Sequence, residues 1–125
     1  MHIGLVDDNP AILEFMTAVL EMEGHTISTY IDGVKFLQTL PSESESHADF
    51  PFDLLILDLW LPGDVSGLDI IKALRRTPVT QHLPILLISG AGQKALEPIR
   101  EQFPYIPILR KPFALDALIE AIEQF

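Results

Sequence analysis

Residues that could do ionic chemistry stand directly after four short apolar segments of this 125-residue sequence. In chain order they are Asp7, Asp8, Asp58, Ser89 and Lys111. Taken singly, each has an ordinary structural explanation. One of the first two aspartates could cap the helix that follows, and the others could be turn or loop residues. If the four segments are parallel strands of one sheet, however, all five side chains meet at the same edge.

A cluster of Asp7, Asp8 and Asp58 would need a proton or a cation. Two unit charges ~4 Å apart repel by about 4 kcal/mol at an effective dielectric constant of about 20. Carboxylate oxygens suit a hard ion such as Mg²⁺, which keeps several waters and uses few protein ligands. Lys111 could neutralise a second negative group, and the hydroxyl of Ser89 could hydrogen-bond it. Such a combination is typical of a site for an aspartyl phosphate.

The elements that must position these residues follow from the hydrophobic pattern, in which apolar runs alternate with amphipathic segments. We predict strands at residues 3–6, 26–30, 54–57, 84–88 and 105–109, and helices at residues 10–23, 34–40, 66–76, from 97 onward, and 115–125. The apolar runs lack period-two alternation, which is typical of parallel strands covered on both faces. The predicted fold class is therefore α/β, with a three-layer, doubly wound sheet of five parallel strands.

Composition limits the function classes. With 48% hydrophobic residues, the sequence predicts one globular domain over residues 1–125. A formal net charge of -10 disfavours direct binding to nucleic acid. The sequence has no cysteine, no signal peptide and no apolar run long enough to cross a bilayer. These features fit a cytoplasmic protein without membrane contact.

The order and spacing of the polar residues give a more specific prediction. The acids, the hydroxyl and the Lys-Pro-Phe sequence resemble the receiver domain of two-component response regulators; the positions are Asp7, Asp8, Asp58, Ser89 and Lys111–Phe113. The resemblance covers the whole chain and implies a flavodoxin-like fold with strand order 2-1-3-4-5. It also implies a phosphorylation-controlled interaction switch rather than an enzyme. The only reactions of such a switch are phosphotransfer to its own aspartate and autodephosphorylation.

The resemblance assigns a role to each residue of the cluster. Asp58 would accept a phosphoryl group from a histidine kinase or a histidine phosphotransfer protein. Mg²⁺ would be the cofactor, held by the carboxylates of Asp8 and Asp58, by Asp7 largely through water, and by the backbone carbonyl of Trp60. Ser89 would bond a phosphoryl oxygen and move inward on activation.

Lys111 would pair with the phosphate, and its bond to Pro112 would be cis, which an X-Pro bond permits at low cost. The sequence ends at Phe125 without a linker or DNA-binding domain. We therefore expect output through contact with a downstream protein target, from a stand-alone regulator or a receiver detached from a longer protein. A homodimer is compatible with the resemblance.

Two positions differ from the usual pattern of the family in ways that affect the switch. Ile108 stands where a Tyr or Phe commonly turns inward, which argues against an aromatic switch. Pro98 falls where the fourth helix should run, and proline is poorly tolerated inside a helix. We therefore predict that this helix begins near Glu97 and that residues 90–96 form a looser segment.

The lifetime of the phosphoryl group can also be predicted from the resemblance. The residues that flank the path of the hydrolytic water are Trp60 and Ala91. Neither carries a carboxylate or amide that could orient a water for in-line attack, so we expect slow autodephosphorylation. The alternative is that Trp60 merely packs on its loop.

Three alternative functions fit the sequence less well. A haloacid-dehalogenase-type hydrolase requires a second acid two residues after the acceptor, where this sequence has Trp60. A flavodoxin-like cofactor protein requires a phosphate loop after the first strand, where Asp7 and Asp8 would repel a phosphate. The remaining alternative is a receiver-like scaffold or interaction module that works without phosphorylation. Such a protein would lack an acid, the hydroxyl or the lysine, and all are present.

Overall fold

The computed structural model describes residues 1–41, 50–61, 63–90 and 92–125. Its elements are, in order, β1 (His2–Val6), α1 (Pro10–Met22), β2 (Thr26–Tyr30), α2 (Gly33–Leu37), β3 (Leu54–Asp58), α3 (Gly67–Arg76), the 3₁₀ turn η1 (Pro78–Thr80), β4 (Ile85–Ser89), α4 (Gln93–Gln102), β5 (Ile108–Arg110) and α5 (Leu115–Glu123). The five strands are parallel and lie in the order β2-β1-β3-β4-β5, which confirms the predicted fold class and strand order.

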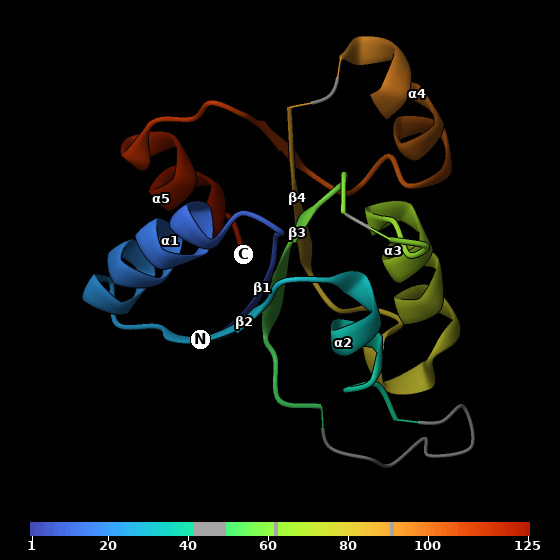
Figure 1. Ribbon diagram of the computed structural model, residues 1–125, viewed down its shortest axis with the longest axis horizontal. Coiled ribbons are helices and arrows are strands. Elements are labelled where there is room, and N and C mark those ends of the chain that lie inside the picture. Colours follow the sequence, from blue (N-terminus) through green and yellow to red (C-terminus); the bar gives the residue numbers. More distant parts are fainter. Residues whose placement is uncertain (42–49, 62, 91) are drawn as a thin grey trace.

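Helices cover both faces of the sheet, with α1 and α5 on one side and α2, α3 and α4 on the other (Figure 1). On the first side, Leu13 and Met16 of α1 and Leu118 of α5 pack against the sheet. On the other side the core contains Phe36 of α2 and Ile70 of α3. Because apolar layers cover both faces, β3 and β4 are buried along their whole length and need no alternation of polar residues. Within the described ranges, no helix combines the length and apolar character needed to cross a membrane.

Helix α1 has a different cap from the one predicted. Neither Asp7 nor Asp8 caps it; Asn9 is the N-cap, and its Oδ1 accepts hydrogen bonds from the backbone nitrogens of Ala11 at 2.9 Å and Ile12 at 3.3 Å. An asparagine one residue nearer the helix satisfies the free N–H groups of the first turn. Both aspartates are thereby left for other roles.

Helix α4 begins at Gln93, so the prediction of a loose segment up to a start near Glu97 is wrong from residue 93 onward. Pro98 lies inside the helix on its exposed side, where its ring nitrogen cannot donate to the carbonyl one turn earlier. Leu96 and Ile99, on either side of it, are buried in the core. Their burial outweighs the one missing backbone hydrogen bond.

Strand β5 is shorter than predicted and begins at Ile108 rather than at residue 105. Pro107, just before it, has no N–H to donate to the ladder, although its carbonyl accepts a hydrogen bond from the backbone nitrogen of Leu87 at 3.0 Å. Tyr105 is largely exposed and lies outside the sheet. With Pro104 and Pro107 in the segment, the strand begins three residues later than predicted and ends one residue later, at Arg110.

Candidate functional site

The end of β3 holds Asp58 in a buried position, with 4% of its surface exposed. The backbone nitrogen of Trp60 donates to Oδ1 of Asp58 at 3.1 Å. The chain then returns so closely that a Cβ on Gly67 would lie 2.6 Å from the carbonyl oxygen of Asp58. Only glycine fits at this start of α3, so the helix N-terminus and the strand end that carries Asp58 are fixed against each other.

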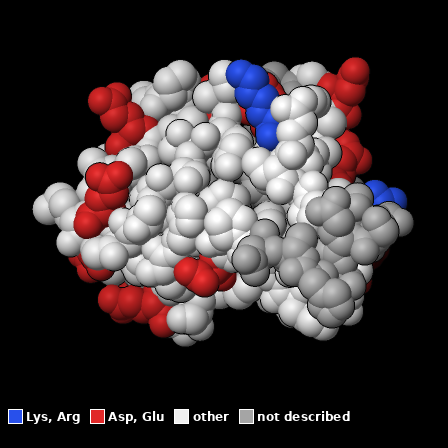
Figure 2. Space-filling view, turned by 90° about the horizontal axis from the view of Figure 1, so that it is seen from below, with Lys and Arg blue, Asp and Glu red and all other residues white. Residues whose placement is uncertain are grey.

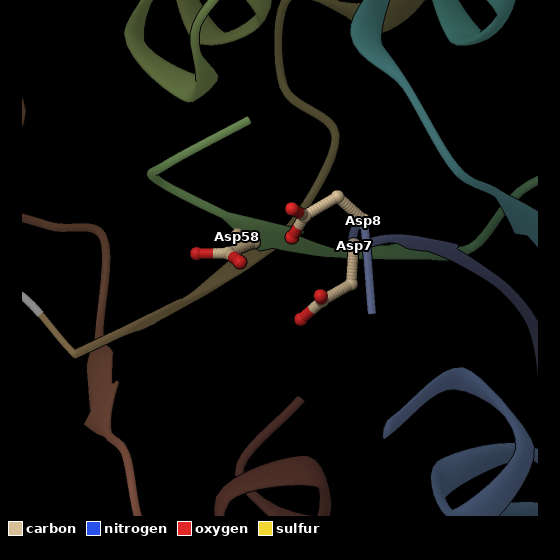
Figure 3. A group of neighbouring side chains, drawn as sticks. All are labelled: Asp7, Asp8 and Asp58. Carbon is tan, nitrogen blue, oxygen red and sulfur yellow. The ribbon is translucent and has the colours of Figure 1, made fainter. Parts of the chain in front are cut away.

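Asp7 lies at the end of the neighbouring strand β1. Its backbone nitrogen donates to the carbonyl of Tyr30 at 3.1 Å, and its Oδ1 accepts from the backbone nitrogen of Asn9 at 2.9 Å. Asp7 is 1% exposed, whereas Asp8 is exposed. One carboxylate oxygen from each of Asp7, Asp8 and Asp58 lies within 4.8 Å of the others. The three acids thus come together from the adjacent ends of β1 and β3, as the sequence predicts (Figure 3).

Lys111 reaches this cluster from the far edge of the sheet. Its Nζ lies 2.8 Å from Oδ2 of Asp7 and 3.0 Å from Oδ2 of Asp58. Its backbone nitrogen donates to the carbonyl of Ser89 at 2.9 Å, which ties the end of β5 to the end of β4. The Lys111–Pro112 bond is cis, as predicted. The predicted lysine therefore pairs with two of the three acids.

Burial and charge alter the protonation of this cluster. Burial raises the pKa of the Asp58 carboxyl above its usual value; the hydrogen bond from Lys111 opposes this rise and the charge of Asp7 adds to it. Burial also acts to lower the pKa of the Lys111 ammonium, but its hydrogen bonds to Asp7 and Asp58 outweigh burial, and the net shift is upward. The lysine consequently stays charged at neutral pH and supplies the positive charge that two buried carboxylates require.

An open cavity of about 590 Å³ lies over the cluster, lined by Asp8, Asp58, Trp60, Gly90, Gly92 and Lys111. The residues present fit a hard divalent cation, because three carboxylates from one sheet edge offer oxygen ligands and the open space leaves room for the waters that Mg²⁺ retains. Ser89 is fully buried at the end of β4, directly before Gly90. The convergence of the three acids and Lys111 is thus as the sequence predicts, and Ser89 lies at the end of β4, the strand next to β3.

Sequence reasoning missed three features of the site. Asn9 as the cap of α1 could have been found, since asparagine before proline is a common helix start. The close approach at Gly67 and the glycine lining at Gly92 carry no local signal, because they depend on which segments meet in space. Ala91, predicted to flank the water path, lies outside the described residues.

Comparison with known proteins agrees with this geometry. The family model of the response regulator receiver domain matches residues 3–123, and the chain belongs to this family. The transcriptional regulatory protein FixJ of Bradyrhizobium diazoefficiens is 30% identical over 123 residues, which are 98% of this chain and 55% of FixJ. The response regulator receiver protein CpdR of Brucella abortus is 28% identical over 98% of this chain and 94% of its own length.

The chain spans about half or less of several relatives. It covers 35% of the DNA-binding dual master transcriptional regulator RpaA of Synechocystis, to which it is 35% identical over 92 residues, or 74% of this chain. Among solved structures, the chemotaxis protein CheY4 of Vibrio cholerae superposes with a TM-score of 0.80 at 23% identity, covering 98% of this chain and 96% of CheY4. This similarity supports the fold independently of the sequence match.

Proposed function

We propose that the chain is a phosphorylation-controlled interaction switch, in which Asp58 accepts a phosphoryl group from a histidine kinase or a histidine phosphotransfer protein. The observation that carries the proposal is the convergence of Asp7, Asp8 and Asp58 within 4.8 Å, with Lys111 bonded to two of them. A purely structural ion pair would need only one acid beside the lysine. Three clustered acids, of which Asp8 and Asp58 line an open cavity, are better explained by a site that receives a cation and an anionic group.

Asp58 is the nucleophile in this proposal. One of its carboxylate oxygens forms the new P–O bond while the P–N bond of a phosphohistidine breaks, and the imidazole leaves with the electron pair of that bond. The Trp60 backbone N–H, 3.1 Å from Oδ1, holds the carboxylate in orientation. Lys111, whose Nζ contacts Oδ2, would pair with the transferred phosphoryl oxygens, and the hydroxyl of Ser89 at the end of β4 would be the second donor.

A magnesium ion would neutralise charge on the transferring phosphoryl group when bound by Asp7, Asp8, Asp58 and the backbone carbonyl of Trp60. In this proposal Asp8 and Asp58 would bind the ion through their carboxylates, and the buried Asp7 would bind it largely through water.

The proposed output is contact with a downstream protein, in the cytoplasm and without direct binding to nucleic acid. The net charge of -10 supports this part of the proposal, because it disfavours approach to a phosphate backbone. No reaction is proposed beyond phosphotransfer to Asp58 and its reversal by hydrolysis. RpaA is named as a DNA-binding regulator, but this chain covers only 35% of its length, so DNA binding is not part of the proposal.

The direct test is labelling with a small-molecule phosphodonor in the presence of Mg²⁺, followed by intact-protein mass spectrometry. We expect one phosphoryl group on the wild type and none on Asp58→Asn. Asp64→Asn is the matched control, because Asp64 is an exposed acid in the loop after β3 and should not affect labelling. If Asp58→Asn is labelled like the wild type, the acceptor is wrong. If the wild type neither takes up phosphate nor binds beryllofluoride with Mg²⁺, the scaffold function replaces this one.

A further inference from the structure

A second cavity lies beside the acidic one and shares Trp60 with it. We call it the Trp60 groove. It has a volume of about 320 Å³ and lies between the segment after β3, helix α3 and helix α4. Apart from Trp60 and Ser66, the residues that line it are apolar: Leu59, Leu61, Leu68, Ala95, Pro98 and Ile99.

The indole beside this groove is unusually open to solvent. Trp60 is 65% exposed, although Leu59 just before it is buried. Exposed tryptophan leaves a large apolar area in water, and tryptophan is enriched at the centres of protein interfaces. The surface therefore presents a projecting aromatic side chain and an apolar hollow side by side. An interface with two-fold symmetry needs such a self-complementary patch, because each copy must supply both partners of the contact.

The charge distribution favours this side of the molecule for contact between two copies. Residues 1–34 contain no Lys or Arg, whereas six of the eight basic residues fall within residues 72–110, from α3 to β5. In Figure 2, acidic side chains lie over both parts of the molecule, whereas the basic side chains in view lie only in the right part, away from the side where Figure 1 places α1 and α5. With a net charge of -10 on each copy, repulsion is smallest where the α3–α4 sides meet.

Helix α4 adds a specific complementarity. Lys94 lies in its first turn and Glu101 in its last, and both are exposed. A two-fold axis next to Pro98 sets the two copies of α4 antiparallel and places Lys94 of each copy opposite Glu101 of the other. The helix dipoles then also oppose each other favourably. Ala95 leaves space in the groove for a side chain of the second copy.

We propose that the chain forms a two-fold symmetric dimer through the Trp60 groove, with the indole of each copy inserted into the groove of the other. The dimer places the second copy beside the mouth of the acidic cavity, which Trp60 also lines. The proposal concerns association alone and does not rest on phosphorylation of Asp58.

Sedimentation equilibrium from about 1 µM to about 1 mM, the range of weak specific interfaces, tests the dimer. We expect a monomer–dimer equilibrium that Trp60→Ser weakens by about thirtyfold, the loss typical of a central interface tryptophan. Met22→Ser is the matched control: Met22 is 86% exposed on α1, on the opposite face of the sheet, and its replacement should leave association unchanged. A wild type that stays monomeric throughout, or equal weakening by Met22→Ser, overturns the proposal.

Fluorescence can test the inserted geometry, because Trp60 is the sole tryptophan of the chain. Wild-type emission should shift to shorter wavelength as concentration rises and the indole becomes buried. Ala95→Glu places a charge in the groove and should abolish this shift. The Trp60→Ser variant lacks the indole but keeps an intact groove, whereas Ala95→Glu keeps the indole. Mixing the two variants should therefore restore the shift, because the indole of Ala95→Glu can enter the groove of Trp60→Ser. If both variants keep the wild-type circular dichroism and the mixture shows no shift, the indole does not enter the groove of the other copy.

Discussion

Lys111 is shared by two carboxylates from two different strands: its Nζ lies 2.8 Å from Oδ2 of Asp7 and 3.0 Å from Oδ2 of Asp58. Both acids are buried, and the lysine is partly buried with them. In this arrangement the ammonium group neutralises the oxygens that a divalent cation would use. Cation binding must therefore compete with the lysine, and the two can be separated by mutation.

Removing the lysine should tighten magnesium binding. Lys111→Ala leaves Asp7 and Asp58 without their positive partner, so we expect Mg²⁺ affinity to rise by about tenfold or more, since a competing charge at contact distance contributes at least ~1.4 kcal/mol. The same variant should lose phosphoryl uptake because the pairing cation is gone. Calorimetric titration of Mg²⁺ measures the first effect, and an unchanged or weaker affinity would show that the lysine does not compete.

Removing the exposed acid should have the opposite effect. Asp8→Ala takes away a carboxylate at the cavity wall while leaving the Lys111 contacts intact, so Mg²⁺ binding should weaken. In the wild type, Mg²⁺ at a hundred times its dissociation constant should stabilise the fold by about 2.7 kcal/mol, and chelation should remove this gain. Thermal unfolding with and without Mg²⁺ is the measurement, and equal stabilisation of Asp8→Ala would exclude Asp8 as a ligand.

The charge on Asp58 should destabilise the fold at neutral pH. Because burial raises the folded-state pKa of Asp58, the folded protein holds this proton more tightly than the unfolded chain. The stabilising contribution is thus complete below the unfolded pKa of about 3.9 and is lost as pH rises through the folded pKa. Asp58→Asn should therefore be more stable than the wild type at pH 7, on the order of 1 kcal/mol, and this advantage should shrink toward acid pH.

Urea unfolding of both proteins across the acid range tests this pH dependence. Asp64→Asn is the control, because Asp64 is exposed and its replacement should change stability little at any pH. A gain for Asp58→Asn that grows toward acid pH would contradict the sign derived above.

Gly67 should be intolerant of any side chain. A Cβ there would lie 2.6 Å from the carbonyl oxygen of Asp58 and 2.7 Å from Cα of Leu59, both backbone atoms that cannot move aside cheaply. We expect Gly67→Ala to destabilise the fold by about 1–3 kcal/mol through overpacking and to reduce phosphoryl uptake by displacing the acceptor. Gly92→Ala is the matched control, since nothing lies within 4 Å of a Cβ there. Comparable losses in both variants would remove the argument from close approach.

The start of α3 depends on a reciprocal cap. Oγ of Ser66 accepts from the backbone nitrogen of Asp69 at 3.2 Å, and Oδ2 of Asp69 accepts from the backbone nitrogen of Ser66 at 2.9 Å. The hydrogen bond from the Ser66 backbone and, to a smaller extent, the one from its side chain lower the pKa of the Asp69 carboxyl. The charged carboxylate of Asp69 therefore stabilises the fold above its unfolded pKa, and this stabilisation is lost as pH falls through the folded pKa. Ser66→Ala should cost about 1 kcal/mol at pH 7, measured by urea unfolding, and an unchanged midpoint would contradict the cap.

The sheet and the convergence of the acids could be predicted from sequence because they depend on strong, local patterns. Continuous apolar runs identify buried parallel strands, and the carboxyl ends of such strands meet at one edge. Asp7, Asp58 and Lys111 therefore had to approach one another once the strand order was correct. Two helix ends are equally local: the side chain of Asp32 caps α2, and Gly24, with φ of 92°, follows α1.

What could not be predicted depends on tertiary packing. The proline rule gives the wrong start for α4, because burial of Leu96 and Ile99 on the core outweighs one lost hydrogen bond. The clearance at Gly67 is set by backbone atoms of β3, which no local pattern reveals. The exposure of Trp60 likewise could not be read from a sequence in which an aromatic residue follows a buried strand.

Trp60 should also prolong the life of the phosphoryl group. Trp60 lines the cavity that also contains Asp58, and its backbone N–H donates to Oδ1 of Asp58 at 3.1 Å, so its side chain would lie beside a phosphoryl group carried by Asp58. An indole cannot orient a water for in-line attack, whereas an amide can. We therefore expect Trp60→Asn, alone and combined with Ala91→Glu, to shorten the phosphoryl lifetime by about tenfold, within the range of a positioned polar group.

The decay of labelled protein measures this rate. It is followed with saturating Mg²⁺ and at low micromolar protein concentration, so that association does not contribute. Met22→Asn, a distant exposed apolar position, is the control. A lifetime in Trp60→Asn equal to or longer than that of the wild type would mean that the indole only packs on its loop.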